Sequence, residues 1–206
     1  MSFLKKVALA DSPHYIVPKV PDDLKYAKTS REKQYLEIIN KLLTVVKSDP
    51  MTGLTHKEDF RSKERGPGIY IMIDGDGLKK MNDTYGHEAG HAAILALAQG
   101  IKVVLRKDTT MSKRKETVTR AGGDEFIVHV EDVSIPTGVI VANRILESIR
   151  KQKVSDNYTG KADLSAIKLT ASLGVGYSEE EADKALYKAK QAGRNRVEFY
   201  KETLVH

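Results

Sequence analysis

The chain has 206 residues, no cysteine and a formal net charge of +6, with 40% hydrophobic and 30% charged residues. This length is enough to bury a core, and the absence of cysteine excludes a disulfide scaffold and a cysteine-ligated metal. No apolar run approaches the ~18 residues that a membrane span requires, and the apolar stretch after Met1 is too short for a signal peptide, so we expect a cytoplasmic protein.

The first 48 residues read as an extension, and residues 49–206 as the main domain. Three prolines break residues 1–21, which we expect to be extended or loosely packed. From about residue 22 to residue 47, apolar side chains recur every three or four residues and predict an amphipathic helix. They are Tyr35, Ile38, Ile39, Leu42, Val45 and Val46.

The main domain alternates strand and helix patterns. We expect a strand over 68–74, helices over 77–84 and 87–106, a hairpin over 116–131, a helix over 136–152, a strand over 167–177, a helix over 179–191 and a short strand over 196–200. This order is typical of the split-βαβ, ferredoxin-like plan. The predicted fold is therefore α+β, a central antiparallel sheet flanked by helices, with the end of the first strand beside the hairpin.

Carboxylates gather where these two elements meet. The pair Gly122-Gly123 predicts a tight hairpin turn, because glycine readily adopts the positive φ that such turns need, and this places Asp124 and Glu125 at the tip. Asp74 ends the strand before it. Converging carboxylates bind Mg²⁺ through hard oxygen ligands, an arrangement suited to phosphoryl transfer. The alternatives are a solvated acidic turn and, for Asp74, a helix N-cap.

Six motifs follow one another along the chain: 49–54 (DPMTGL), 74–83 (DGDGLKKMND), 85–87 (YGH), 122–126 (GGDEF), 171–176 (ASLGVG) and 182–195 (ADKALYKAKQAGRN). In this order they resemble the GGDEF family of diguanylate cyclases, over about residues 49–200. The resemblance implies condensation of two GTP into cyclic di-GMP with release of pyrophosphate, in a homodimer, with two Mg²⁺ or Mn²⁺ per active site. In that family a helix before the domain often pairs as a coiled coil, but fewer than four heptads fit here, and the helix could instead pack on its own domain.

The resemblance also implies roles at the carboxylate cluster. Asp74, the backbone carbonyl of Gly75 and Asp124 would hold the metal pair, and Asp124 would help to deprotonate the attacking 3′-hydroxyl. Glu125 would lie in or near the same shell. Arg120, beside the hairpin, is a further candidate for contacting a phosphate or the transition state.

Phosphate contacts are implied for three cations and one helix start. Lys79 would reach the β- and γ-phosphates, and the N–H groups of residues 76–79, including Gly77 and Leu78, would add donors. Lys190 and Arg194 match the family's phosphate contacts, and their four-residue separation would let both point the same way. Taken singly, each cation could equally be a solvated surface side chain.

Base recognition is where the chain departs from the family. Asn82 matches one guanine-reading residue, but His91 stands where relatives have Asp. Guanine offers two adjacent donors, which a neutral imidazole with one acceptor cannot both satisfy, whereas adenine could pair with an imidazole N–H. We therefore expect GTP as substrate, with ATP as the alternative. His87 and His91 have metal-ligand spacing but no evident third ligand.

Two further features concern ligands and regulation. The basic residues are spread over the chain without interleaved aromatics, so we do not expect a nucleic-acid partner. The family's Arg-x-x-Asp product-inhibition motif is replaced by Lys113-Arg-Lys-Glu116, and lysine does not reproduce bidentate capture by arginine, so we expect weak or absent feedback. The remaining alternatives are a degenerate domain that binds nucleotide or a partner without turnover, and a relative that makes another oligonucleotide from ATP; the intact metal shell favours an active cyclase.

Overall fold

The computed structural model describes residues 30–46, 48–107, 115–154, 164 and 167–201. The internal contacts of the chain divide it into two units, residues 1–44 and 45–206. Helix α2 runs over Ser30–Val46, within the range expected for the amphipathic helix. The rest of that range, 22–29 and 47, lies outside the described residues, as do the proline-broken segment 1–21 and the basic residues 113 and 114.

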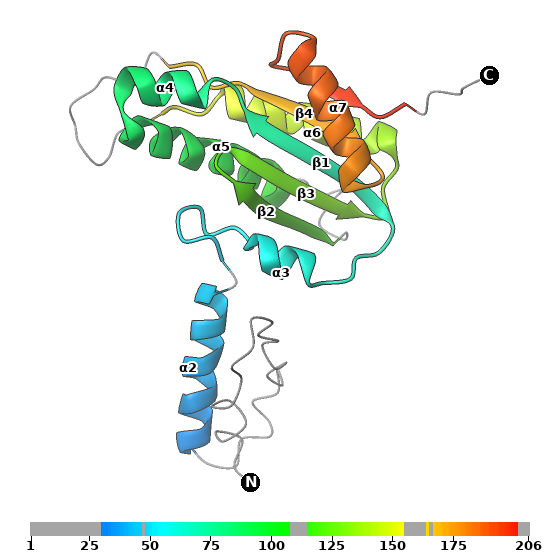
Figure 1. Cartoon of the computed structure of the whole chain (residues 1–206). Helices are drawn as coiled ribbons and strands as arrows, with labels where there is room; N and C mark the ends of the chain where they lie inside the picture. The colour runs from blue at the N-terminus through cyan, green and yellow to red at the C-terminus, as the bar shows by residue number, and fades with distance from the viewer. Residues whose placement is uncertain (1–29, 47, 108–114, 155–163, 165–166, 202–206) are drawn as a thin grey trace, which may run out of the picture. The chain divides into compact units, whose positions relative to one another are not determined.

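The main unit is built on a five-stranded sheet (Figure 1) in the order β2-β3-β1-β4-β5. The strands are β1 (Gly68–Gly75), β2 (Glu116–Gly122), β3 (Glu125–Glu131), β4 (Ala171–Gly176) and β5 (Val197–Phe199). Strand β1 lies at the centre and pairs antiparallel with both β3 and β4. The predicted α+β fold is confirmed, with one parallel pair, β4–β5, at the edge.

Helices cover both faces of this sheet. The helices of the main unit are α3 (Lys57–Arg61), α4 (Leu78–Tyr85), α5 (His87–Lys107), α6 (Ile135–Arg150) and α7 (Glu179–Gln191). A Cβ placed on Gly174 would lie 2.2 Å from the backbone nitrogen of Leu186 in α7, whereas a Cβ on Gly138 of α6 would meet Val175 at 3.1 Å. Neighbouring strand residues point to opposite faces, so α6 and α7 lie on opposite sides of β4 (Figure 1).

Helix α5 is the longest helix of the core. Its residues His87–Leu105 are long and apolar enough to cross a membrane by length and composition, with mean hydropathy 1.3, so the expectation that no such run exists is wrong. Ala93, Leu97 and Ile101 are at most 2% exposed and belong to the hydrophobic core. A core helix that is mostly buried can be as long and apolar as a membrane span, and 56% of this stretch of α5 is buried in the domain.

Candidate active site

The hairpin between β2 and β3 carries the predicted acidic tip. Gly122 and Gly123 have φ of 154° and 52°, as the turn prediction required. The tip is held against β1, because the Gly75 N–H donates to the Asp124 carbonyl at 3.1 Å. Asp74 lies opposite Glu125 in the β1–β3 ladder. The end of β1 and the hairpin tip therefore bring the acidic residues together, as the topology predicted.

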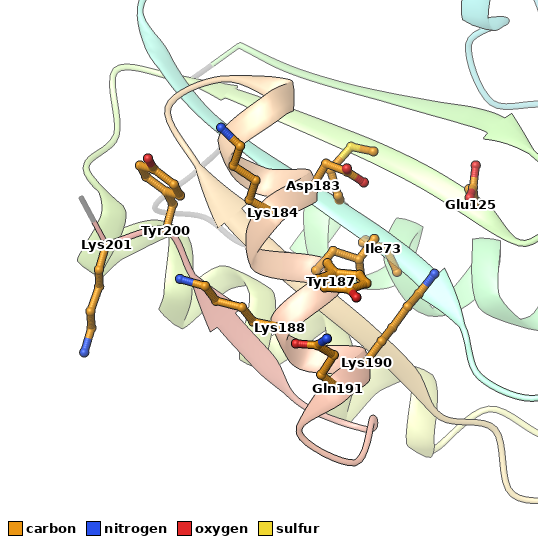
Figure 2. A pocket seen from close by; sticks show the side chains of 12 residues that line it. Ile73, Glu125, Asp183, Lys184, Tyr187, Lys188, Lys190, Gln191, Tyr200 and Lys201 are labelled. Carbon is orange, nitrogen blue, oxygen red and sulfur yellow. The ribbon is translucent and has the colours of Figure 1, made fainter. Parts of the chain in front are cut away.

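The charges at this junction are unbalanced. Burial raises the pKa of Asp124 above its ordinary value, the negative charges of Asp74 and Glu125 raise it further, and the Lys190 ammonium partly offsets them. Lys190 extends from α7 to the end of β1 (Figure 2), where its Nζ lies 2.6 Å from Oδ2 of Asp74. Lys190 is partly exposed and pairs with Asp74, while Asp74 and Glu125 both add negative charge near Asp124.

These residues fit a divalent cation. Asp74 and Asp124 supply hard carboxylate oxygens close enough for their charges to interact, and a bound cation would relieve the repulsion that helps to raise the Asp124 pKa. Asp74 is not a helix cap, since the N-cap of α4 is Gly77. Among the described residues no group of three or more His, Asp or Glu side chains is placed to hold a metal. Backbone carbonyls, substrate phosphates and water would have to complete the coordination.

A cleft of about 720 Å³ lies at the start of α4 and is lined by Gly77, Lys79 and Arg194, among others. The first N–H groups of a helix have no acceptor within it, which leaves those of Leu78 and Lys79 suited to an anion. The N–H of Asp76, however, donates to the Thr170 carbonyl at 2.9 Å, so its expected part in anion binding is wrong.

Lys190 and Arg194 do not line the same cavity. Lys190 lines the groove around α7 that also holds Tyr187 and Glu125 (Figure 2), whereas Arg194 lines the cleft with Lys79. The expectation that both point the same way is therefore not met, because α7 ends at Gln191 and Arg194 follows in a turn with φ of +62°. Of these two cations, Arg194 lines the cleft with Lys79 and Lys190 does not.

The two candidate base-reading residues lie on adjacent helices, α4 and α5. Oδ1 of Asn82 is buried and has no hydrogen-bond partner within the described part of the chain. His91 is on α5 with its side chain 49% exposed, and its Nδ1 lies 3.8 Å from the Glu88 carboxylate. A buried acceptor without a partner is costly, and it suits a ligand that brings a donor.

The Arg120 side chain is held by contacts with two other residues. Its Nη1 lies 3.2 Å from Oδ2 of Asp49, and its Nε donates to the Gly123 carbonyl at 2.8 Å. Burial raises the pKa of Asp49, but hydrogen bonds from Thr52 and the Arg120 charge outweigh it and hold the pKa below its ordinary value. Arg120 thus braces the hairpin turn against residues 49–52, a link that sequence reasoning missed; direct contact of Arg120 with a phosphate stays a prediction.

The carboxylate of Asp76 makes contacts that its motif did not predict. Its carboxylate accepts hydrogen bonds from the hydroxyls of Thr170 and Ser172 and from the N–H of Asn195. The motif Asp74-Gly-Asp76 contained it, but the partners are 94 to 119 positions away in the chain, so local pattern gave no signal.

Comparison with known proteins places this geometry in a family. Residues 46–196 match the family model described as "Diguanylate cyclase, GGDEF domain". Diguanylate cyclase A of Treponema denticola is 38% identical over 144 residues, which is 65% of this chain and 35% of that protein. An uncharacterized membrane protein of Staphylococcus aureus is 30% identical over 186 residues, covering 80% of this chain and 49% of the relative.

A solved structure shows the same fold. The diguanylate cyclase SiaD of Pseudomonas aeruginosa, crystallised in complex with its activator SiaC, has a TM-score of 0.63 and 27% identity, over 82% of this chain and 68% of that one. The chain spans only about a third to a half of the length of the two curated relatives. The match therefore covers the domain that contains the site described above, and not the full length of those relatives.

Proposed function

The chain belongs to the GGDEF family of diguanylate cyclases, and from that premise we propose that it condenses two GTP into cyclic di-GMP, releasing two pyrophosphates. The observation that carries the proposal is the convergence of Asp74 and Asp124 at the end of β1, with the Asp124 pKa raised by burial and by the Asp74 charge. An acidic site of this kind next to a cleft lined by Lys79 and Arg194 suits metal-assisted attack on a triphosphate.

The side chains of the site have separate roles in the reaction. Asp124, at the hairpin tip beside Asp74, accepts the proton of the attacking 3′-hydroxyl. The oxygen then bonds to the α-phosphorus of the second nucleotide, and pyrophosphate leaves from it. Lys79 and Arg194 bind the β- and γ-phosphates in the cleft that both line. Lys190 forms an ion pair with the Asp74 carboxylate.

Two Mg²⁺ or Mn²⁺ ions, held by Asp74, Asp124 and the Gly75 carbonyl, would supply positive charge to the phosphates and lower the pKa of the hydroxyl. One site of this size holds one nucleotide, so the reaction needs two copies of the chain facing each other across a twofold axis. Since nucleoside triphosphate is the substrate, we place the domain in the cytoplasm.

A second product is favoured by one observation: the buried Asn82 acceptor has no hydrogen-bond partner within the described residues, and His91 on the adjacent helix is half exposed. The Asn82 oxygen can accept a hydrogen bond from either base. Neutral His91 has one acceptor and cannot accept both adjacent guanine donors as a carboxylate would, whereas its N–H could pair with adenine. We infer relaxed base selection, with measurable use of ATP and formation of mixed cyclic dinucleotide.

The tests are direct. Asp74→Asn and Asp124→Asn should each abolish product formation and weaken Mn²⁺ binding measured by paramagnetic relaxation, while the far-UV spectrum stays unchanged. His91→Asp should raise the GTP-over-ATP preference by about ten- to a hundredfold, the worth of one good buried hydrogen bond. Product formation at the wild-type rate by both carboxamide variants would remove the proposed site, and an unchanged GTP/ATP ratio in His91→Asp would remove the inferred base selection.

A further inference from the structure

The turn after α7 is held from two sides. Arg194 and Asn195 have φ of +62° and +50°, a left-handed conformation that non-glycine residues adopt uncommonly and at a cost. Two successive residues of this kind persist only when their surroundings hold them. The turn lies between α7 and β5, and it carries Arg194 into the cleft that Lys79 also lines.

Asp76 holds the turn from the end of β1. Its Oδ2 accepts the Asn195 N–H at 3.1 Å and the Thr170 hydroxyl at 2.9 Å, and its Oδ1 accepts the Ser172 hydroxyl at 2.8 Å. Its own N–H donates to the Thr170 carbonyl at 2.9 Å. These bonds hold the Asp76 side chain against Thr170 and Ser172, at the start of β4. They also fix the position of Oδ2, the oxygen that accepts the Asn195 N–H.

Arg150, the last residue of α6, holds the same turn from the other side. Its Nε donates to Oδ1 of Asn195 and its Nη2 to the Asn195 carbonyl, both at 2.9 Å, while Nη1 is paired with Glu147. The guanidinium fork makes both contacts in one plane, which a lysine cannot do. The backbone and side chain of Asn195 are thus bonded at three points by two charged residues from different elements.

We propose that Asp76 and Arg150 are positioning residues that clamp the turn at Asn195 so that Arg194 stands ready for the terminal phosphates of the bound nucleotide. This rests on the proposed function for the identity of the ligand, but the clamp itself is a property of the chain. A guanidinium held in place before binding loses less conformational freedom when the triphosphate arrives, so affinity rises without a new contact. The clamp should therefore act on triphosphate affinity alone.

The experiment compares two ligands that differ in their terminal phosphates. Affinities for GMP and for a GTP analogue with a methylene bridge between the α- and β-phosphates, which cannot release pyrophosphate, are measured by calorimetry in Mg²⁺. Asp76→Asn and Arg150→Lys should each weaken binding of the analogue about three- to tenfold and leave GMP affinity within about twofold. Complete loss of the Arg194 contact should weaken analogue binding more, by about tenfold or more.

Three further variants make the result specific. In an Arg194→Ala background, Asp76→Asn should have no additional effect, because the group it positions is gone. Ser172→Ala removes a bond to Oδ1 of Asp76 but keeps the Oδ2 contact to the turn, so it should lower the unfolding temperature without changing the ratio of the two affinities. Lys151→Met removes a cation next to Arg150 and should change neither.

Amide hydrogen exchange separates this inference from the proposed function. Asp76→Asn should speed exchange in the peptide containing residues 193–196 at least several-fold, with peptides of β1 and α5 unchanged. Unchanged exchange in that turn, equal loss of GMP and analogue affinity, or a full Asp76→Asn effect in the Arg194→Ala background would overturn the clamp. If the wild-type chain bound neither nucleotide, the proposed function would fail, and the exchange result would still decide whether the clamp exists.

Discussion

Gly90 of α5 gives the sharpest test of the base pocket. A Cβ built there would lie 1.8 Å from Oδ1 of Asn82, well inside any real contact. Elsewhere in a helix, replacing glycine by alanine stabilises by ~0.5–1 kcal/mol. In Gly90→Ala the clash falls on the end of a side chain, which can rotate away at low cost. We therefore expect little change in stability but loss of the Asn82 orientation.

The size of the effect follows from that one hydrogen bond. Losing a buried base contact costs ~1–3 kcal/mol, so Gly90→Ala should lower GTP affinity about 5- to 150-fold. Calorimetry with the methylene-bridged GTP analogue measures this, and thermal unfolding measures stability. Asn82→Ala is the matched comparison, and adding Gly90→Ala to it should have no further effect on affinity. Wild-type affinity in Gly90→Ala would refute the placement of Asn82 in the base site.

Three other outcomes are expected. Asp124→Asn should end turnover yet unfold at a higher temperature than wild type at pH 7, because burial and the Asp74 charge raise the pKa of Asp124 in the folded chain. Above the ordinary aspartate pKa of 3.8, ionised Asp124 destabilises the wild-type fold, so the advantage of the variant in unfolding temperature should vanish as the pH falls toward 3.8. Asp49→Asn should lower stability by ~1 kcal/mol and reduce kcat more than it raises KM, because the brace on Arg120 and the hairpin weakens; equal changes in both would contradict this. Lys190→Met should tighten Mn²⁺ binding to the nucleotide-free chain about three- to tenfold by removing a competing cation from Asp74, and unchanged binding would mean that Lys190 does not compete.

Local pattern in the sequence predicted the elements well, because helices, strands and turns follow short-range rules. The hairpin followed from two glycines, and the meeting of Asp74 with Asp124 followed from the order of strands and helices. The start of β4 was set too early, at 167 instead of Ala171. Ladder pairing with β1 ends at Gly75, whose partner is Ala171, and a strand cannot extend beyond its neighbour without losing its hydrogen bonds.

The side-chain ties between distant segments could not be predicted in this way. Arg120 pairs with Asp49 across 71 positions, and Asp76 bonds Asn195 across 119. In the sequence, Arg120 and Asp76 are single charged residues within motifs, and no periodic pattern indicates which distant residue each one contacts. Lys190 illustrates the same limit, because its spacing from Arg194 was known but the end of α7 between them decided which cavity each would face.

The most direct measurement of the central claim is the product itself. Purified chain is incubated with Mg²⁺ and GTP, ATP or both, over a wide dilution series, and products are identified by mass. We predict cyclic di-GMP from GTP, a smaller amount of mixed cyclic dinucleotide when ATP is added, and specific activity that falls on dilution as the two half-sites separate. Absence of any cyclic dinucleotide at protein concentrations where the chain is dimeric by light scattering would contradict the account.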